Sequence, residues 1–230
     1  MFSANDLHLK AQKLREHAQS AEALALYEQA LVEYITDQDT EGIVRVLLEK
    51  DITYQHLYLF TKQYIYLELS ATTLQMAEHM MHVNSEALDG ELQALVVFHV
   101  AQLTEAMNES AEAIQIYEEA LEYIPEESAL RANMLSHLAV SEWNNQDTEK
   151  ASAHFTEAHE MLEKLSADLD DTTRTIWLTG SLLRQAIAMK KSDPEKSLQY
   201  MKVAEELLES EEKFPIRWFQ LQELREELAG

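Results

Sequence analysis

The sequence of 230 residues has no cysteine, four glycines, three prolines and only 18 basic side chains against 42 acidic ones. The lack of cysteine excludes disulfides, thiolate catalysis and cysteine-ligated zinc. It also fits a reducing compartment, so we expect a cytoplasmic protein. Because glycine and proline are the main turn-forming residues, their scarcity predicts long helices joined by short polar loops.

Long hydrophobic runs are missing too. The longest apolar stretch, near Leu95 to Val100, is far too short to cross a membrane. The first residues lack the basic start and apolar run of a signal peptide. A net charge of −24 disfavours nucleic acid and anionic membranes as partners, since both are polyanions.

The acidic charge is uneven. Between Gln63 and Leu130 there are 13 Asp and Glu residues but no Lys or Arg. Two interpretations remain open for this segment. It is either a well-solvated acidic surface that keeps the protein soluble or an attractor for a cationic partner segment.

Three segments share one internal pattern: a small residue, an aromatic residue four positions later, and an alanine three positions after that. The segments are SAEALALYEQAL at 20–31, ESAEAIQIYEEALEYIP at 109–125 and KASAHFTEAHEML at 150–162. The matching triplets are Ala23, Tyr27, Ala30; Ala113, Tyr117, Ala120; and Ala151, Phe155, Ala158. Such self-similarity predicts stacked helical hairpins, an architecture that usually presents a binding surface.

Helical periodicity is nearly continuous and predicts eleven helices. Ser192 and Asp193 stand where an N-cap belongs, with Pro194 at the first helical position, and Pro125 ends a helix. No flexible linker divides the chain, so we expect one domain over residues 1–230. The expected helices are 5–17, 20–35, 41–60, 63–82, 86–106, 110–123, 127–144, 147–165, 171–190, 194–210 and 215–229.

The repeated triplets, with Pro125 closing one of them, resemble the tetratricopeptide repeat (TPR), in which small residues let paired helices approach and an aromatic residue fills the space between them. The resemblance is degenerate in two repeats, which carry Ser70 and Ser197 at a small-residue position. It implies an all-α, right-handed superhelix of about five TPR-like hairpins. The repeats fall at about 4–38, 41–84, 86–126, 127–166 and 171–211, followed by a C-terminal capping helix at 215–229.

In this family the first helix of each hairpin lines a concave groove that receives partner peptides. By register, the resemblance implies partner-binding roles for His56, Phe98, His99, Gln102, Asn133, His137 and Trp143. The three histidines fall at one repeat position. They form either a chance alignment or a ladder that would gain charge near pH 6 and weaken the capture of cationic ligands. Phe98 and Trp143 either anchor a partner or pack on the neighbouring hairpin.

We therefore expect a non-catalytic protein- or peptide-binding scaffold with an acidic groove that favours a cationic partner, and with no cofactor and no metal. The Lys, Asn and Arg residues of the carboxylate-clamp subtype are missing at the corresponding positions. One alternative is a TPR-like bacterial sensor of signalling peptides that acts through a separate output partner. An enzyme would need a pocket of convergent titratable groups. Two smaller hypotheses are a metal site at His79 and His82, and a homodimer through the terminal hairpins near Trp177, Trp218 and Phe219.

Overall fold

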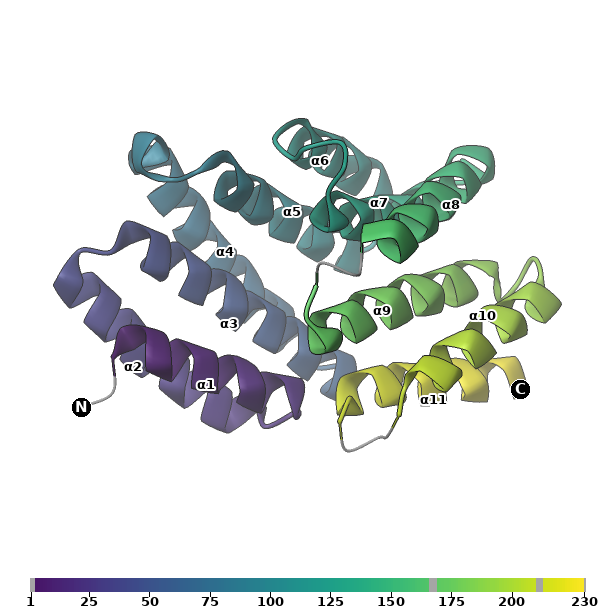
Figure 1. Cartoon of the computed structure of the whole chain (residues 1–230), viewed down its shortest axis with the longest axis horizontal. Helices are drawn as coiled ribbons and strands as arrows, with labels where there is room; N and C mark the ends of the chain where they lie inside the picture. Colours follow the sequence, from purple (N-terminus) through teal and green to yellow (C-terminus); the bar gives the residue numbers. More distant parts are fainter. Residues whose placement is uncertain (1–2, 166–168, 210–212, 230) are drawn as a thin grey trace. The chain divides into compact units, whose positions relative to one another are not determined.

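The computed structural model describes residues 3–165, 169–209 and 213–229. These residues form eleven α-helices and one short 3-10 helix, and they include no strand (Figure 1). The elements are α1 (Ala4–Glu16), α2 (Ser20–Asp37), α3 (Thr40–Thr61), α4 (Ile65–Val83), η1 (Ser85–Ala87), α5 (Gly90–Ala106), α6 (Ser110–Glu122), α7 (Ala129–Asn144), α8 (Thr148–Leu165), α9 (Asp171–Met189), α10 (Pro194–Leu207) and α11 (Pro215–Ala229).

The predicted all-α class is confirmed, and most helix starts lie within two residues of the expected ones. Polar side chains cap several of these starts. Asp193 accepts a hydrogen bond from the Lys196 amide at 3.0 Å, with Pro194 in the first turn as predicted. The largest difference is at the helix expected from residue 86, which begins at Gly90 because Asp89 caps it and residues Ser85–Ala87 form the 3-10 turn. The expected ends at residues 166, 210 and 211 lie outside the described residues.

The chain separates into two compact units, Met1–Met107 and Asn108–Gly230. The division falls between α5 and α6, inside the hairpin predicted for residues 86–126. Each unit is described on its own below. The expectation of a single domain over the whole chain stays a prediction.

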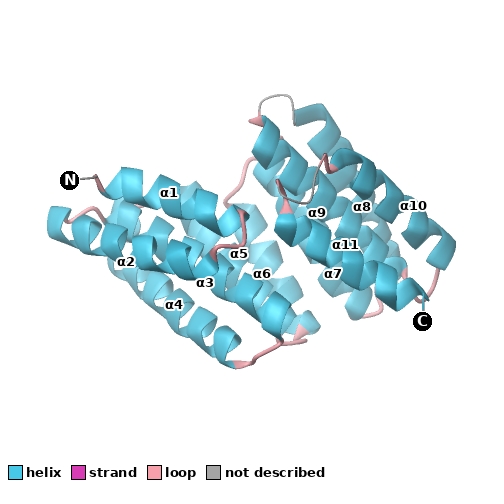
Figure 2. Ribbon diagram, turned by 90° about the horizontal axis from the view of Figure 1, so that it is seen from below, coloured by secondary structure: helices cyan, strands magenta, loops and turns pink. Residues whose placement is uncertain are grey.

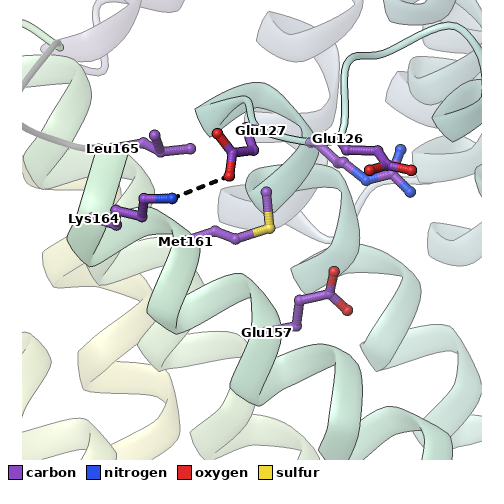
Figure 3. A pocket seen from close by; sticks show the side chains of 7 residues that line it. Glu126, Glu127, Glu157, Met161, Lys164 and Leu165 are labelled. Atoms are coloured by element: carbon purple, nitrogen blue, oxygen red, sulfur yellow. Dashed lines mark hydrogen bonds and ion pairs between the residues drawn. The ribbon is translucent and has the colours of Figure 1, made fainter.

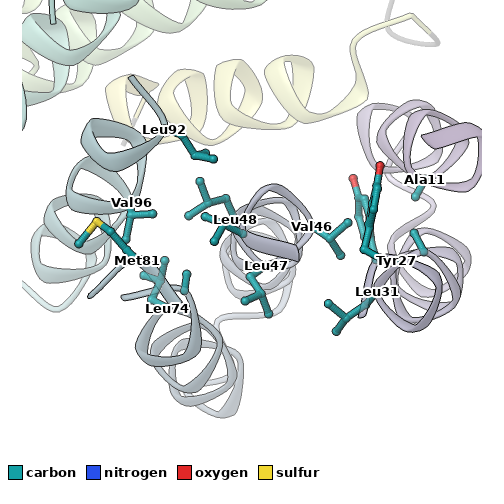
Figure 4. Packing of buried hydrophobic residues seen from close by; sticks show 14 of the residues in the cluster. Ala11, Tyr27, Leu31, Val46, Leu47, Leu48, Leu74, Met81, Leu92 and Val96 are labelled. Carbon is teal, nitrogen blue, oxygen red and sulfur yellow. The ribbon is translucent and has the colours of Figure 1, made fainter. Parts of the chain in front are cut away.

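In the first unit, α3 is the central helix and contacts α1, α2, α4 and α5. Its buried face supplies Val46, Leu47 and Leu48 on successive positions. Figure 4 shows Val46 directed toward Tyr27 of α2 and Leu48 toward the opposite side of the helix, with Leu47 pointing between these two directions. Because α3 is apolar around so much of its circumference, four helices can pack against it, and any polar side chain buried on it must find a partner in the interior.

The second unit is built from the pairs α7–α8 and α9–α10, with α6 packed on α7 and α11 packed on α9 and α10 (Figure 2). The apolar cluster around α11 contains Phe214, Leu221 and Leu224, which are at most 3% exposed. They pack with residues of α9 and α10 such as Leu183 and Met201. Helix α11 thus occupies the predicted residues 215–229 and covers apolar surface of the preceding hairpin.

Candidate functional site

Two tyrosines at the same place in their repeats define the register of the first helices. The Tyr27 hydroxyl donates to Glu49 Oε2 at 3.2 Å, and the Tyr117 ring lies 6.2 Å from the His137 ring. Glu49 of α3 and His137 of α7 therefore occupy equivalent positions. The residue aligned with His137 on α3 is Glu49, and His56, which we aligned there from the sequence, lies seven residues further along the helix.

The difference in register arises because α3 and α4 form a longer hairpin. Helix α3 ends at Thr61, ten residues after Asp51, whereas α7 ends at Asn144, five residues after the equivalent Ala139. The Ser70 hydroxyl of α4 donates to Asp51 Oδ1, which ties the small-residue position of α4 to Asp51. An acidic side chain thus stands where the first, third and fourth repeats have Ala11, Ala101 and Ala139, so an alignment based on small residues did not find this register.

A charged cluster lies among α1, α2 and α3 and is centred on Glu49. Arg15 Nη1 lies 2.5 Å from Glu49 Oε2, and Gln12 Nε2 donates to Glu49 Oε1 at 2.8 Å. Burial alone would raise the pKa of Glu49, but the charge of Arg15 and the hydrogen bond from Gln12 outweigh it, so this pKa is lowered. Burial and the nearby Glu49 raise the pKa of Tyr27. The cluster therefore holds an ionised carboxylate beside a neutral phenol.

A second cluster connects α3, α4 and α5 through Asp51, which is fully buried. His99 Nδ1 lies 2.7 Å from Asp51 Oδ2, and Gln55 Nε2 donates to both carboxylate oxygens at 3.0 Å. The group contains Ser, His and Asp, but the carboxylate stands between the hydroxyl and the imidazole. A nucleophilic triad needs a bond from Ser to His, so this order of contacts is suited to structure rather than to activation of Ser70.

The predicted partner-binding residues of the first unit differ in accessibility. Phe98 is 3% exposed and His99 is 5% exposed, and their rings meet edge to face at 5.8 Å. His56 and Gln102 are half-buried. A partner can therefore reach His56 and Gln102 more easily than Phe98 and His99, whose binding roles remain predictions.

In the second unit, two predicted residues lie on the same face of α7. Asn133 Oδ1 accepts a hydrogen bond from Arg184 Nη2 of α9 at 3.0 Å, and the same guanidinium donates to Ser136 Oγ at 2.7 Å from Nη2 and 3.0 Å from Nε. His137 stands next to Ser136 in the chain and is half-buried. Asn133 thus faces Arg184 of α9, and His137 lies beside Tyr117 of α6.

Trp143 lies at the end of α7, where it packs against a buried cluster that includes Val140 and Phe155, with Ala188 of α9 also in contact. Its ring is half-buried. Of the two roles that the sequence left open for Trp143, packing on the neighbouring hairpin fits this position. A role as a partner anchor stays a prediction.

Helix α7 also carries a buried glutamate. The Glu142 side chain is 2% exposed, and its Oε2 lies 2.8 Å from His154 Nδ1 of α8. Burial raises the pKa of Glu142, although the hydrogen bond and charge of His154 act in the opposite direction. This carboxyl group is therefore held in an environment that disfavours its charge.

An open depression of about 450 Å³ lies beside the start of α7 and the end of α8 (Figure 3). Glu127 and Lys164 form an ion pair across it at 3.2 Å, and Met161 supplies its apolar surface. Both charged side chains are more than half exposed. Exposed pairs of this kind contribute little binding energy, so the depression is a weak candidate for a specific site.

The remaining hypotheses from the sequence concern metals and dimerisation. Within residues 3–165, 169–209 and 213–229, the structure holds no cluster of three His, Cys, Asp or Glu residues that could bind a metal ion. Trp218 packs against the cluster under α11, while Trp177 and Phe219 are half-buried. None of the helices in the described part of the chain is long and apolar enough to cross a membrane.

Arg184, Gly180 and Arg217 meet in the second unit and were not among the residues singled out from the sequence. The signal available was a lone glycine in the middle of a helical segment, which is unfavourable without a packing reason. Comparisons of the sequence with models of known protein families and with curated proteins find no significant match.

Proposed function

We propose that the chain is a TPR-like repeat protein that acts as a non-catalytic scaffold for a protein or peptide segment. The observation that carries this proposal is the side-by-side packing of α7 and α9, the first helices of two successive hairpins. They share a row of partly exposed polar side chains that includes Asn133, His137 and Arg184. Recurrence of polar groups along neighbouring repeats is how helical arrays recognise an extended segment.

The charge of the protein supports a partner with a basic segment. The net charge is −24, and no Lys or Arg occurs between Gln63 and Leu130. A field of this sign accelerates the encounter with a cationic chain and makes the affinity sensitive to salt. We propose that the acidic surface selects the partner and that the polar row on the first helices fixes its position.

A selection from a library of random displayed peptides tests the proposal. We expect enriched sequences to contain Lys and Arg, and their affinity to fall as salt is raised from about 50 to 300 mM, which shortens the Debye length about 2.4-fold. The variants Asn133→Ala and His137→Ala should each bind about two- to twelvefold more weakly, since polar contacts contribute roughly 0.5–1.5 kcal/mol each. Fluorescence anisotropy with the selected peptides measures both effects.

Gln75→Ala is the matched control, because Gln75 is exposed on α4, outside the polar row. Unchanged binding in Asn133→Ala and His137→Ala, or an equal loss in Gln75→Ala, would contradict the assigned surface. The sensor alternative makes a further demand: the enriched peptide should reduce the radius of gyration of the protein. A scaffold should bind without that change.

A further inference from the structure

Helix α4 of the first unit exposes a row of large apolar side chains. One side of the helix packs on α3 and α5, and the opposite side carries Ile65, Leu69, Met76 and Val83, each between 38% and 66% exposed. Figure 2 shows α4 along one edge of the first unit. Single exposed apolar residues are common on protein surfaces, but four in a row along one helix form a patch of the kind that marks an interaction site.

The row follows the spacing with which two helices pack side by side. The residues of this α4 seam are Ile65, Leu69, Thr72, Met76, His79 and Val83. They recur at alternating intervals of four and three residues, the seven-residue period of paired helices. The Thr72 hydroxyl already donates to the Glu68 backbone carbonyl at 2.9 Å, so it needs no partner in such a contact. His79 can cover an apolar neighbour with its ring while its nitrogens stay in water. The seam therefore fits another helix.

The intervals of the α4 seam read the same in both directions, so the seam is complementary to itself. When a second copy of α4 runs antiparallel to the first, every seam residue meets another seam residue. Ile65 faces Val83 of the second copy, Leu69 faces its His79, and Thr72 faces its Met76. A two-fold symmetric interface requires this property, because one patch must bind an identical patch.

The charged residues beside the seam also favour a second copy. Glu68 and His82 are exposed on the same flank of α4, toward opposite ends of the helix. Antiparallel pairing places Glu68 of each copy beside His82 of the other, where the carboxylate can accept a hydrogen bond from the imidazole. Like charges do not meet in this arrangement.

The number of acidic residues argues against a cationic helix as the occupant. Helix α4 carries only Glu68 and Glu78, whereas α2, α6, α8 and α10 each carry three or four acidic residues. Glu78 is half-buried, so a basic partner would find one exposed carboxylate on this helix. For two copies of a chain with net charge −24, the same shortage keeps the local repulsion small.

We propose that two copies of the chain form a two-fold symmetric dimer through antiparallel α4 helices that meet at the α4 seam. The 19 residues of α4 span about 28 Å. One pair of helices of this length buries less surface than an obligate dimer interface, so the dimer is reversible. The dimer does not depend on the proposed peptide-binding function, which uses the first helices α7 and α9.

Sedimentation velocity of the whole protein between about 1 and 300 µM measures the self-association. We expect the weight-average sedimentation coefficient to rise with concentration from the value of a monomer toward that of a dimer. Added salt should strengthen the dimer, because it screens the repulsion between two acidic copies. The same salt should weaken the binding of a cationic peptide, so the dimer and the proposed peptide-binding function can fail independently.

The variant Met76→Glu should weaken the dimer about tenfold or more, because each dimer contains the change twice and each change places a carboxylate in an apolar contact. Val32→Glu is the matched control. Val32 is an exposed apolar residue on α2 of the same unit, so this variant adds the same charge outside the seam. It should dimerise as the wild type does. Circular dichroism confirms that both variants are folded.

The absence of cysteine from the chain allows a test of the orientation. In an antiparallel pair, Glu68 of one copy lies beside His82 of the other, whereas the two copies of Glu68 are about 21 Å apart along the helices. A mixture of Glu68→Cys and His82→Cys should therefore form cross-linked dimers with a short bis-maleimide reagent, and neither variant alone should. Equal cross-linking of either variant alone, equal weakening in Val32→Glu and Met76→Glu, or a protein that stays monomeric at the highest concentration would overturn the dimer. The last outcome would leave the seam to a helix of a different protein.

Discussion

Glu49 of α3 and Glu142 of α7 are glutamates of first helices that point into the protein, yet their environments have opposite effects. Glu49 faces the Arg15 guanidinium at 2.5 Å, and its pKa is lowered even though burial opposes this. Glu142 bonds the His154 imidazole, and burial raises its pKa although the charges of His154 and Lys150 act in the opposite direction. The first unit thus compensates an interior carboxylate with a permanent cation, whereas the second unit leaves the carboxylate poorly compensated.

The same contrast holds at the position of Asp51. In the first unit, the Ser70 hydroxyl donates to the Asp51 carboxylate, and His99 bonds the other oxygen. In the second unit, the Ser197 hydroxyl donates at 2.7 Å to the backbone carbonyl of Ala186, which is fully buried. Equivalent serines therefore find an acceptor either in a side chain or in the backbone. A carboxylate is accommodated only where neighbouring helices supply enough donors.

Removing the Glu49 side chain should have the largest effect on stability. Glu49→Ala leaves Arg15, whose side chain is 11% exposed, without its main counter-charge, and losing one partner of a buried pair costs about 3–5 kcal/mol. Urea unfolding followed by far-UV circular dichroism measures the loss. The double variant Arg15→Met, Glu49→Leu should recover most of it, because both charges then leave the interior.

Glu41→Ala is the matched control on α3, since Glu41 forms an exposed pair with Arg45 and should cost at most about 1 kcal/mol. All three tryptophans, Trp143, Trp177 and Trp218, lie in the second unit. Their fluorescence reports whether Glu49→Ala also disturbs that unit. Equal losses for Glu41→Ala and Glu49→Ala would remove the contrast between compensated and exposed pairs.

Asp51→Ala should have the next largest effect, about 2–3 kcal/mol, because it leaves three buried or half-buried donors without their acceptor. These donors are Ser70, Gln55 and His99. His99→Leu alone should also destabilise the protein. The double variant should cost less than the sum of the two single variants, because their effects share one contact. Additive losses in this cycle would show that Asp51 and His99 act independently.

The sequence predicted the helices well because capping residues and Pro194 mark their starts locally. It located the second hairpin but aligned its first helix differently with the other repeats, because that alignment depends on contacts between helices. The alignment relied on small residues, and the fully buried Asp51 occupies the small-residue position of α3. The cluster at Gly180 was not predictable for a similar reason. Arg217 reaches Gly180 only through the packing of α11 on α9, which no local pattern encodes.

The environment of His8 makes the stability of the protein depend on pH. Burial lowers the pKa of His8 below its ordinary value of 6.5; Arg15 and Arg45 act in the same direction and Glu49 opposes them. The rings of Tyr27 and Tyr34 pack edge-on against it. The unfolded chain therefore takes up this proton first, so stability is complete above about pH 6.5 and declines as pH falls below it.

Replacing His8 with Gln should reduce the slope of the unfolding free energy against pH by at most about 1.4 kcal/mol per pH unit, the value for one proton. His17→Gln is the control, because His17 is exposed just after α1. Urea unfolding at intervals between pH 5 and 8 measures both slopes. An unchanged slope in His8→Gln would place the pH sensitivity of the protein elsewhere.

Glu142→Gln should have the smallest effect and the opposite sign to Glu49→Ala. Because burial raises the pKa of Glu142, the folded state binds a proton more readily than the unfolded chain, and stability falls as pH rises through the folded pKa. At pH 7 the neutral glutamine keeps an oxygen for His154 and avoids burying a charge, so the variant should be more stable than the wild type. The advantage should disappear as pH falls toward 4.5, where the wild-type carboxyl becomes protonated.

Glu149→Gln, an exposed change on α8, measures the general benefit of removing one negative charge from a protein of net charge −24. Only the gain in stability of Glu142→Gln beyond that of Glu149→Gln reports the poorly compensated carboxylate, and unfolding followed by the fluorescence of the adjacent Trp143 measures it. If the two gains are equal, Glu49 and Glu142 differ in geometry and not in energy.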